Sequence, residues 1–174
     1  LLNVNLIDYQ FVKRYNGNIR VYLKKRGKIF KSKKKINNNL RSEKMIINKI
    51  KNFQTKVDNW KYNKKQLIDK LVKQKGPIPA KAFPGRASIL INLLDLDSKS
   101  ISNIYEKNFS LKVNKFAPGT NIKILKEKNL SYDERNKGVI INFAWHISKE
   151  IKKYLRDNLK YKGKIIDLIS KSDF

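Results

Sequence analysis

The sequence predicts a protein of the α/β class, with a parallel sheet flanked by helices that follows a β-hairpin and a long helix. Near the start, two strand-like runs are separated by an Asn-Gly turn signal, and residues 40–75 then contain neither Pro nor Gly. After Gly76, short apolar runs alternate with amphipathic ones. Such alternation is typical of βαβ units, which build parallel sheets.

The first part of the chain, residues 1–39, is expected to form the hairpin and a linker. Residues 3–12 and 18–25 carry apolar and β-branched side chains over the length of a strand. The segment 27–39 is polar and rich in charge, so we interpret it as an exposed connection.

The second part, residues 40–75, is predicted to form a connecting amphipathic helix. Apolar side chains recur there at intervals of three and four positions, from Met45 to Val72, which places them along one face. We expect this face to pack against a core rather than a partner. The polar stretch from Asn59 to Asn63 predicts an interruption of the helix.

The third part, residues 76–174, is predicted to be a Rossmann-like domain of about 100 residues. Parallel strands need helical crossovers, and these are almost always right-handed. The expected strands lie at 78–83, at 101–106, within 117–125, at 138–145 and at 164–169. The expected helices lie at 86–96 and 147–162.

The composition restricts the classes of function. Lys and Arg number 41 against 14 Asp and Glu, and the resulting net charge of +27 makes nucleic acid a candidate partner. The basic residues are mostly Lys, scattered among many Asn and Ile, as an AT-rich gene encodes them. The sequence shows no Arg-rich recognition helix and no basic residues interleaved with aromatics. We therefore expect contact with nucleic acid only through generic charge.

The absence of cysteine excludes disulfides and thiolate zinc sites, and a single histidine does not suggest a metal site. No apolar run is long enough to span a bilayer, and the start does not resemble a signal peptide. We expect a cytoplasmic location and no membrane partner. Because the chain begins with Leu1, we expect either a piece of something longer or a trimmed terminus.

The turn before the helix at 86–96 is a candidate anion site. Ligands of open α/β sheets bind beyond the carboxyl ends of the strands, where the first turn of a helix presents unpaired N–H groups. The helix start includes Ala87, while Arg86 can add a bidentate contact and Ser88 a hydroxyl. The local sequence FPGRAS matches neither standard phosphate-binding fingerprint, so an ordinary tight turn is the alternative that it favours.

Further candidate residues follow the later strands. Glu106 ends a strand where dinucleotide-binding folds keep an acid for a ribose hydroxyl, although a solvated surface acid is the alternative. Thr120 and Asn121 follow a Pro-Gly turn and can offer hydrogen bonds. Trp145 and His146 are expected to end an apolar strand, with His146 either a general acid or base or a polar cap. No catalytic set can be assembled from the sequence.

Four motifs, in this order and spacing, resemble the C-terminal domain of sugar C-methyltransferases. They are FPGRASILINLLDL, YEKNFSLKVNKFAPGTNIKI, VIINFAWHISKEI and YKGKIIDLI. The matching positions are Pro84, Arg86, Ala87, Ser88, Leu90, Asn92, Glu106, Ser110, Lys112, Pro118, Gly119, Thr120, Ile122, Ala144, Trp145, Glu150, Ile151, Gly163 and Lys164. The chain departs from the pattern at Ala82 and Asn114, where the family has Gly, and at His146, where it has Asn.

Residues 2–25 more weakly resemble the last two strands of that family's methyltransferase domain. Gly17, Arg20, Val21 and Tyr22 match, whereas Tyr15 stands where the family has His. The resemblance therefore makes Tyr15, Arg20 and His146 possible residues of the site lining, and it makes residues 1–39 a remnant of the end of a methyltransferase domain.

The resemblance implies the C-terminal, nucleotide-sugar-binding part of an S-adenosylmethionine-dependent enzyme of deoxysugar or surface polysaccharide biosynthesis. The diphosphate would lie at residues 86–88, with Lys112 neutralising phosphate charge and Thr120 and Asn121 as polar contacts. S-adenosylmethionine would be bound by an upstream domain or chain, so no cofactor and no turnover are expected here. A stand-alone Rossmann-like nucleotide-binding module, a truncated remnant and a basic nucleic-acid-binding protein are the alternatives.

Overall fold

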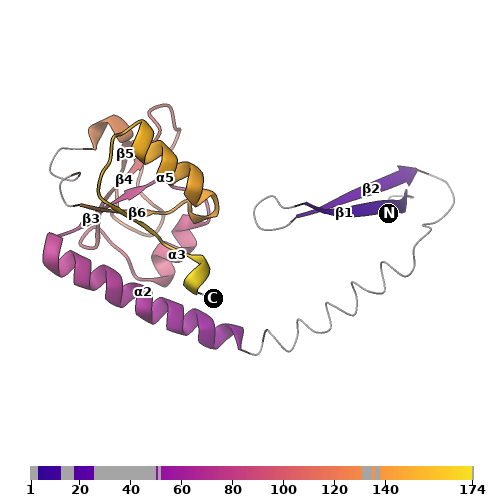
Figure 1. The fold of residues 1–174 in the computed structure, drawn as a ribbon, viewed down its shortest axis with the longest axis horizontal. Helices are drawn as coiled ribbons and strands as arrows, with labels where there is room; N and C mark the ends of the chain where they lie inside the picture. The colour runs from indigo at the N-terminus through magenta and orange to yellow at the C-terminus, as the bar shows by residue number, and fades with distance from the viewer. Residues whose placement is uncertain are drawn as a thin grey trace. The chain divides into compact units, whose positions relative to one another are not determined.

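The computed structural model describes residues 4–12, 18–25, 50, 52–130, 135 and 138–173. The chain divides into two compact units, residues 1–55 and 56–174. The first unit contains a two-stranded hairpin, and the second contains a five-stranded sheet with its helices (Figure 1).

The predicted hairpin consists of β1 (Val4–Val12) and β2 (Asn18–Lys25), which pair antiparallel. All residues of β2 are exposed to solvent. Strand side chains alternate between faces, so one face of the hairpin is apolar and the other polar. The cross-strand pairs of the apolar face are Leu6 with Leu23, Tyr9 with Val21 and Phe11 with Ile19.

The predicted connecting helix is described from residue 53 onward, as α2 (Phe53–Lys75). It runs without the interruption expected between Asn59 and Asn63, and that expectation is wrong. Asn costs only about 0.7 kcal/mol relative to Ala inside a helix, which the packing of Trp60 and Ile68 into the core outweighs. Residues 40–49 lie outside the described part of the chain.

The second unit is built on a parallel sheet, as the α/β prediction requires. Its strands are β3 (Ile78–Lys81), β4 (Ile101–Glu106), β5 (Ile124–Lys126), β6 (Val139–Asn142) and β7 (Lys164–Asp167). Their order is β5-β4-β3-β6-β7, and all neighbouring pairs are parallel. The chain adds strands first on one side of β3 and then on the other, so the switch point of this Rossmann-like sheet lies between β3 and β6.

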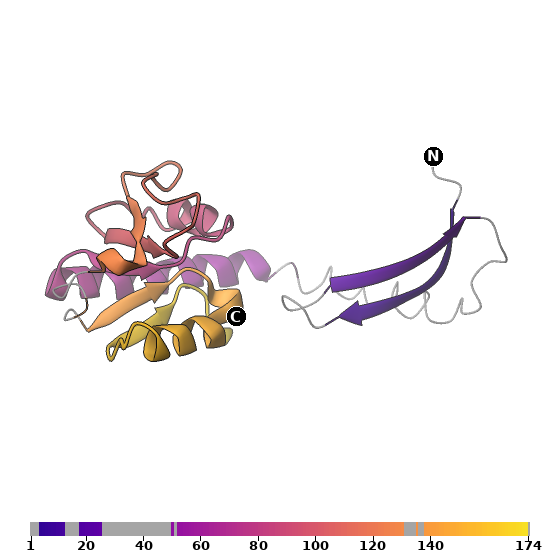
Figure 2. The same ribbon diagram turned by 90° about the horizontal axis from the view of Figure 1, so that it is seen from above.

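Helices cover both faces of this sheet (Figures 1 and 2). In β6, Val139 and Ile141 belong to the core cluster that includes α2 and α3 (Ala87–Leu93). Ile140 points to the opposite face, where it packs with Leu155 of α5 (Ser148–Asp157). A strand that is apolar at consecutive positions is therefore explained by burial on both faces.

The apolar strand predicted at 138–145 is shorter in the structure. It was expected to end at Trp145 and His146, but β6 ends at Asn142, and both residues lie in the short 3₁₀ helix η3 (Trp145–Ile147). The carboxamide oxygen of Asn142 accepts a hydrogen bond from the Ala144 N–H at 2.9 Å. This local bond turns the chain away from the ladder directly after the strand.

Each strand of the sheet ends on a polar residue at its carboxyl end. These residues are Lys81, Glu106, Lys126, Asn142 and Asp167. Register places Lys81 opposite Asn142, Asn142 opposite Asp167, and Glu106 opposite Lys126. Because the strands are parallel, this polar row follows a single edge of the sheet, and ligands bind at that edge in open α/β folds.

Candidate functional site

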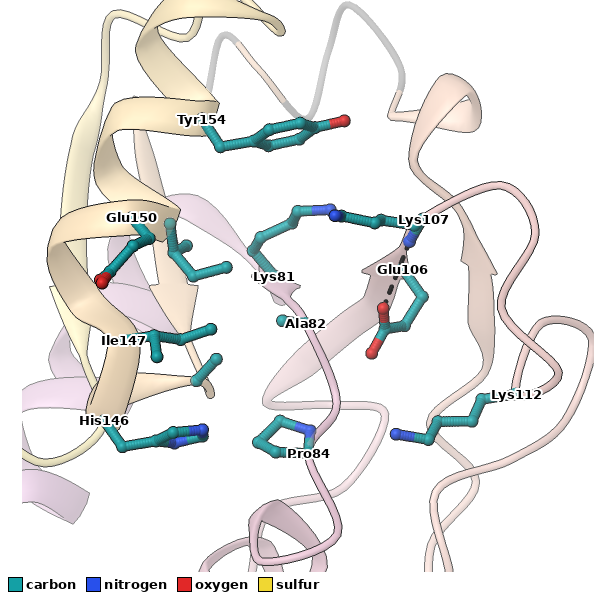
Figure 3. Close-up of a pocket in the computed structure, with 12 residues that line it drawn as sticks. Lys81, Ala82, Pro84, Glu106, Lys107, Lys112, His146, Ile147, Glu150 and Tyr154 are labelled. Carbon is teal, nitrogen blue, oxygen red and sulfur yellow. Dashed lines mark hydrogen bonds between the residues drawn. The ribbon is translucent and has the colours of Figure 1, made fainter. Parts of the chain in front are cut away.

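A pocket of about 350 Å³ opens at this edge, above the switch point between β3 and β6 (Figure 3). One wall comes from the ends of β3 and β4 and the loops after them, and the other from η3 and α5. The apolar part of the lining comprises Ala82, Pro84, Ala144, Ile147 and Ile151. The polar part includes three of the predicted site residues, Glu106, Lys112 and His146.

Glu106 holds the chain that leaves β3. Its Oε1 accepts a hydrogen bond from the Phe83 N–H at 2.6 Å, and its Oε2 accepts one from the Lys107 N–H at 3.2 Å (Figure 3). Lys112 also bonds to the backbone of Phe83, because its Nζ donates to the Phe83 carbonyl at 2.5 Å. Both residues line the pocket and also fasten one of its walls.

The turn that follows β3 is bent at Ala82, whose φ of 65° lies in the left-handed region. The family pattern has Gly at this position, and the backbone keeps the conformation that favours Gly. Asn114 also stands in place of a family Gly and has a φ of 65°. Both positions thus have a backbone conformation that favours Gly, although neither residue is Gly.

The predicted anion site at residues 86–88 lies beyond the pocket lining. Arg86 is exposed and precedes α3, and Ala87 is fully buried in the core. The Ala87 N–H donates to the Pro84 carbonyl at 2.8 Å, and the Ser88 hydroxyl donates to the Gly85 carbonyl at 2.9 Å. Two of the donors that were expected to bind an anion, the Ala87 N–H and the Ser88 hydroxyl, therefore already bond to carbonyls of the same turn.

Thr120 and Asn121 belong to a turn that packs on α3. The Thr120 hydroxyl bonds to the Ala117 carbonyl at 2.9 Å and accepts from the Ile122 N–H, while Asn121 is exposed. Asn92 connects the turn to the helix by donating to the Pro118 carbonyl at 3.3 Å. Neither Thr120 nor Asn121 lines the pocket.

His146 lies on the η3 side of the pocket. Burial lowers the pKa of its imidazole below the ordinary value of 6.5, the nearby Arg86 guanidinium lowers it further, and Glu150 partly opposes both effects. The ring also packs edge-on against Trp145, with 5.7 Å between ring centroids. The imidazole is therefore neutral at pH 7 and is able to accept or donate a hydrogen bond.

Two residues of the lining, Lys81 and Tyr154, belong to an ionic cluster with Glu127 that the sequence did not predict. Lys81 Nζ lies 2.6 Å from Glu127 Oε2, and the Tyr154 hydroxyl donates to Glu127 Oε1 at 2.6 Å. Only 2% of Lys81 and 7% of Glu127 are exposed. The hydrogen bond to Glu127, together with burial, raises the pKa of Tyr154 to about 12, so the phenol stays neutral.

A usable signal for this cluster was present in the sequence. Lys81 is the single charged residue in the apolar run 78–83, and in the structure it ends β3 at the ligand edge of the sheet. Tyr154 belongs to the helix predicted at 147–162, and its ring faces the pocket. Glu127 follows β5 in the short helix η2 (Glu127–Asn129), and only the fold brings it to Lys81.

The two remaining candidates belong to the first unit. Arg20 lies in β2 opposite Gln10, on the polar face of the hairpin. Tyr15 lies outside the described residues. The residues that line the pocket lie between Lys81 and Tyr154, within the second unit.

Among the described residues, no group of three or more His, Cys, Asp or Glu side chains is placed to hold a metal ion. In the same part of the chain, none of the helices has both the length and the apolar character needed to cross a membrane.

Comparison with known families agrees with the motifs. A search of curated proteins found no match. A family profile described as the C-methyltransferase C-terminal domain matches residues 14–169, which is well over half of the chain. The resemblance inferred from the four motifs is confirmed by this match, and the chain belongs to the C-methyltransferase C-terminal domain family.

Proposed function

We propose that this chain is the nucleotide-sugar-binding part of an S-adenosylmethionine-dependent sugar C-methyltransferase, and that it transfers no methyl group by itself. The observation that carries the proposal is the position of the pocket at the switch point of a Rossmann-like sheet in a chain of this family. Nucleotides bind at that point in folds of this topology.

The lining of the pocket suits one part of such a ligand. Its volume of about 350 Å³ lies at the low end of the range of small-molecule sites, so it accommodates a sugar or a ribose with a phosphate. Ala82, Ala144 and Ile151 offer an apolar surface, while Glu106 keeps lone pairs for a hydroxyl group. In the proposal, the rest of the ligand extends toward a second domain.

The pocket fits S-adenosylmethionine poorly. The sulfonium of this donor is cationic, and the lysines of the pocket lining, Lys81, Lys107 and Lys112, outnumber its carboxylates, Glu106 and Glu150. The turn after β3 contains a single glycine, Gly85, and no glycine-rich cofactor loop. The proposal therefore assigns binding of S-adenosylmethionine to an upstream domain or chain. It also places the chain in the cytoplasm, where this methyl donor is available.

The hairpin supports the proposal of an upstream partner. Ile19, Val21 and Leu23 are each at least half exposed on its apolar face. An isolated two-stranded hairpin is marginally stable in water, because it leaves such a face uncovered. In the proposal, the hairpin completes the sheet of the methyl-donor domain, which covers this face.

Calorimetric titration tests the binding function. UDP, dTDP, GDP and their glucose conjugates are titrated into the chain, and at least one conjugate should bind with a sub-millimolar Kd. Lys99→Gln is the matched control: Lys99 is exposed in the turn before β4, at the opposite edge of the sheet, and should not alter binding. Failure of all six probes to bind would contradict the proposal and would favour a remnant whose site has decayed.

A radiolabelled methyl-transfer assay tests the second claim, that the chain transfers no methyl group by itself. The chain is incubated with S-adenosylmethionine and a keto-sugar nucleotide, and the sugar should remain unlabelled. Transfer of the label by the purified 174 residues would overturn the assignment of the donor site to another domain.

A further inference from the structure

Two lysine side chains approach the same aromatic ring inside the pocket. Lys81 Nζ lies 5.3 Å from the centroid of the Tyr154 ring, and Lys107 Nζ lies 5.7 Å from it. Figure 3 shows the two side chains reaching toward each other below that ring, from the ends of β3 and β4. Two positive charges therefore lie near the Tyr154 ring of α5, at one end of the pocket.

The two lysines differ in how their charge is balanced. Lys81 is buried and is held by Glu127, whose second carboxylate oxygen accepts the Tyr154 hydroxyl. Lys107 is exposed, and its ammonium group makes no ion pair with any side chain among the described residues 52–130, 135 and 138–173. The cluster therefore has one negative and two positive charges, and Lys107 carries the unbalanced one.

The other cationic groups near the pocket are already engaged or lie elsewhere. Lys112 donates to the Phe83 carbonyl. Arg86 is not part of the lining, and two donors of the 86–88 turn bond to neighbouring carbonyls. Glu106 repels an anion at its own position, because its oxygens accept N–H groups without losing the negative charge.

We infer that Lys107, with the fixed charge of Lys81 behind it and the Tyr154 ring above, binds a phosphate group of the ligand. This inference rests on the proposed function and gives the ligand a direction in the pocket. The phosphate lies at the α5 end, and hydroxyl groups of the ribose or sugar lie toward Glu106. It moves the expected phosphate contact from residues 86–88 to the end of β4.

Paired titrations separate the phosphate contact from the rest of the site. The probes are UDP, dTDP and GDP, each compared with its nucleoside, which lacks phosphate. Lys107→Gln should weaken binding of the diphosphate at least tenfold and leave binding of the nucleoside unchanged. Lys107→Arg should restore most of the affinity, because the positive charge is kept. A fold defect would weaken both members of each pair, and thermal melts compare the stability of the variants.

Two further variants decide whether the phosphate contact lies at Lys107 or in the 86–88 turn. Arg86→Ala and the control Lys99→Gln should each change diphosphate affinity less than twofold. If Arg86→Ala weakens binding tenfold while Lys107→Gln does not, the inference is wrong and the proposed function stands. If the wild-type chain binds neither nucleoside diphosphates nor their glucose conjugates, the proposed function fails and the inference fails with it.

Discussion

The Phe83 N–H donates to Glu106 Oε1 at 2.6 Å, so the acid at the end of β4 also holds the turn after β3. Two loops that form one wall of the pocket are joined by this bond. A buried donor that loses its acceptor costs about 1–3 kcal/mol.

Glu106→Ala should therefore lower the free energy of unfolding by about 1–3 kcal/mol. Glu106→Gln should cost less, because its carbonyl oxygen still accepts the Phe83 N–H. Urea denaturation measures both changes. The control is Glu150→Ala, an exposed carboxylate of the same pocket, which should cost under about 1 kcal/mol as a first-turn helix acid. Equal effects of Glu106→Ala and Glu150→Ala would show that the bond to Phe83 contributes nothing.

The Lys81–Glu127 pair should show strong coupling. Removing one partner of a buried ion pair leaves an uncompensated charge, so Lys81→Met should destabilise the chain by about 3–5 kcal/mol. Adding Glu127→Gln removes that charge and keeps an acceptor for Tyr154. The double variant should be more stable than the sum of the single effects predicts, by about 0.5–3 kcal/mol. Strict additivity in a double-mutant cycle would argue against a direct pair.

Two alanines near the end of β3 should respond oppositely to the same substitution. Ala82 has a φ of 65°, which costs an L-residue about 1–2 kcal/mol, so Ala82→Gly should stabilise the chain by up to about 1 kcal/mol. Ala80 lies buried in the regular part of β3, where Gly should destabilise by about 1 kcal/mol or more. Thermal melts compare the two. A loss of stability on Ala82→Gly would contradict the strained turn.

His146 is the single histidine, so its ring protons give one titration curve by NMR. The midpoint should lie below 6.5, Arg86→Ala should raise it, and Glu150→Gln should lower it further. The folded chain resists protonation of this imidazole, so the unfolded state binds more protons as the pH falls. The associated stability is present above pH 6.5 and is lost below it. If Arg86→Ala leaves the midpoint unchanged, the Arg86 guanidinium does not lower the pKa of His146.

The net charge of +27 should produce only weak binding to nucleic acid. Fluorescence anisotropy with duplex DNA is expected to give a Kd in the non-specific range, about 10⁻⁴ to 10⁻⁶ M at physiological salt, and a steep loss of affinity as salt rises. Two duplexes of unrelated sequence should bind alike. Nanomolar binding with a clear preference for one duplex would revive the alternative of a dedicated nucleic-acid-binding protein.

The α/β class, the hairpin, the helix before Gly76 and the family were all determined by the sequence alone. Periodicity identifies strands and helices because it reports which faces are buried, and ordered motifs identify a family because they keep residue type and spacing together. Glu106 could be placed at the ligand edge of the sheet because the carboxyl ends of parallel strands share one edge. Lys112 and the site-lining role of His146 were implied by the family resemblance, and all three residues line the pocket.

The tertiary structure decided which side chains of the pocket and its surroundings bond to one another. Glu127 is 46 positions from Lys81 along the chain, and no local pattern pairs them. The sequence placed Arg86 and Ser88 at a ligand site, yet the folded turn uses the Ser88 hydroxyl itself and leaves Arg86 outside the lining. A sequence shows which groups are able to form hydrogen bonds. A hydrogen bond forms only when donor and acceptor lie about 3 Å apart, and the packing of the sheet and its loops sets those distances.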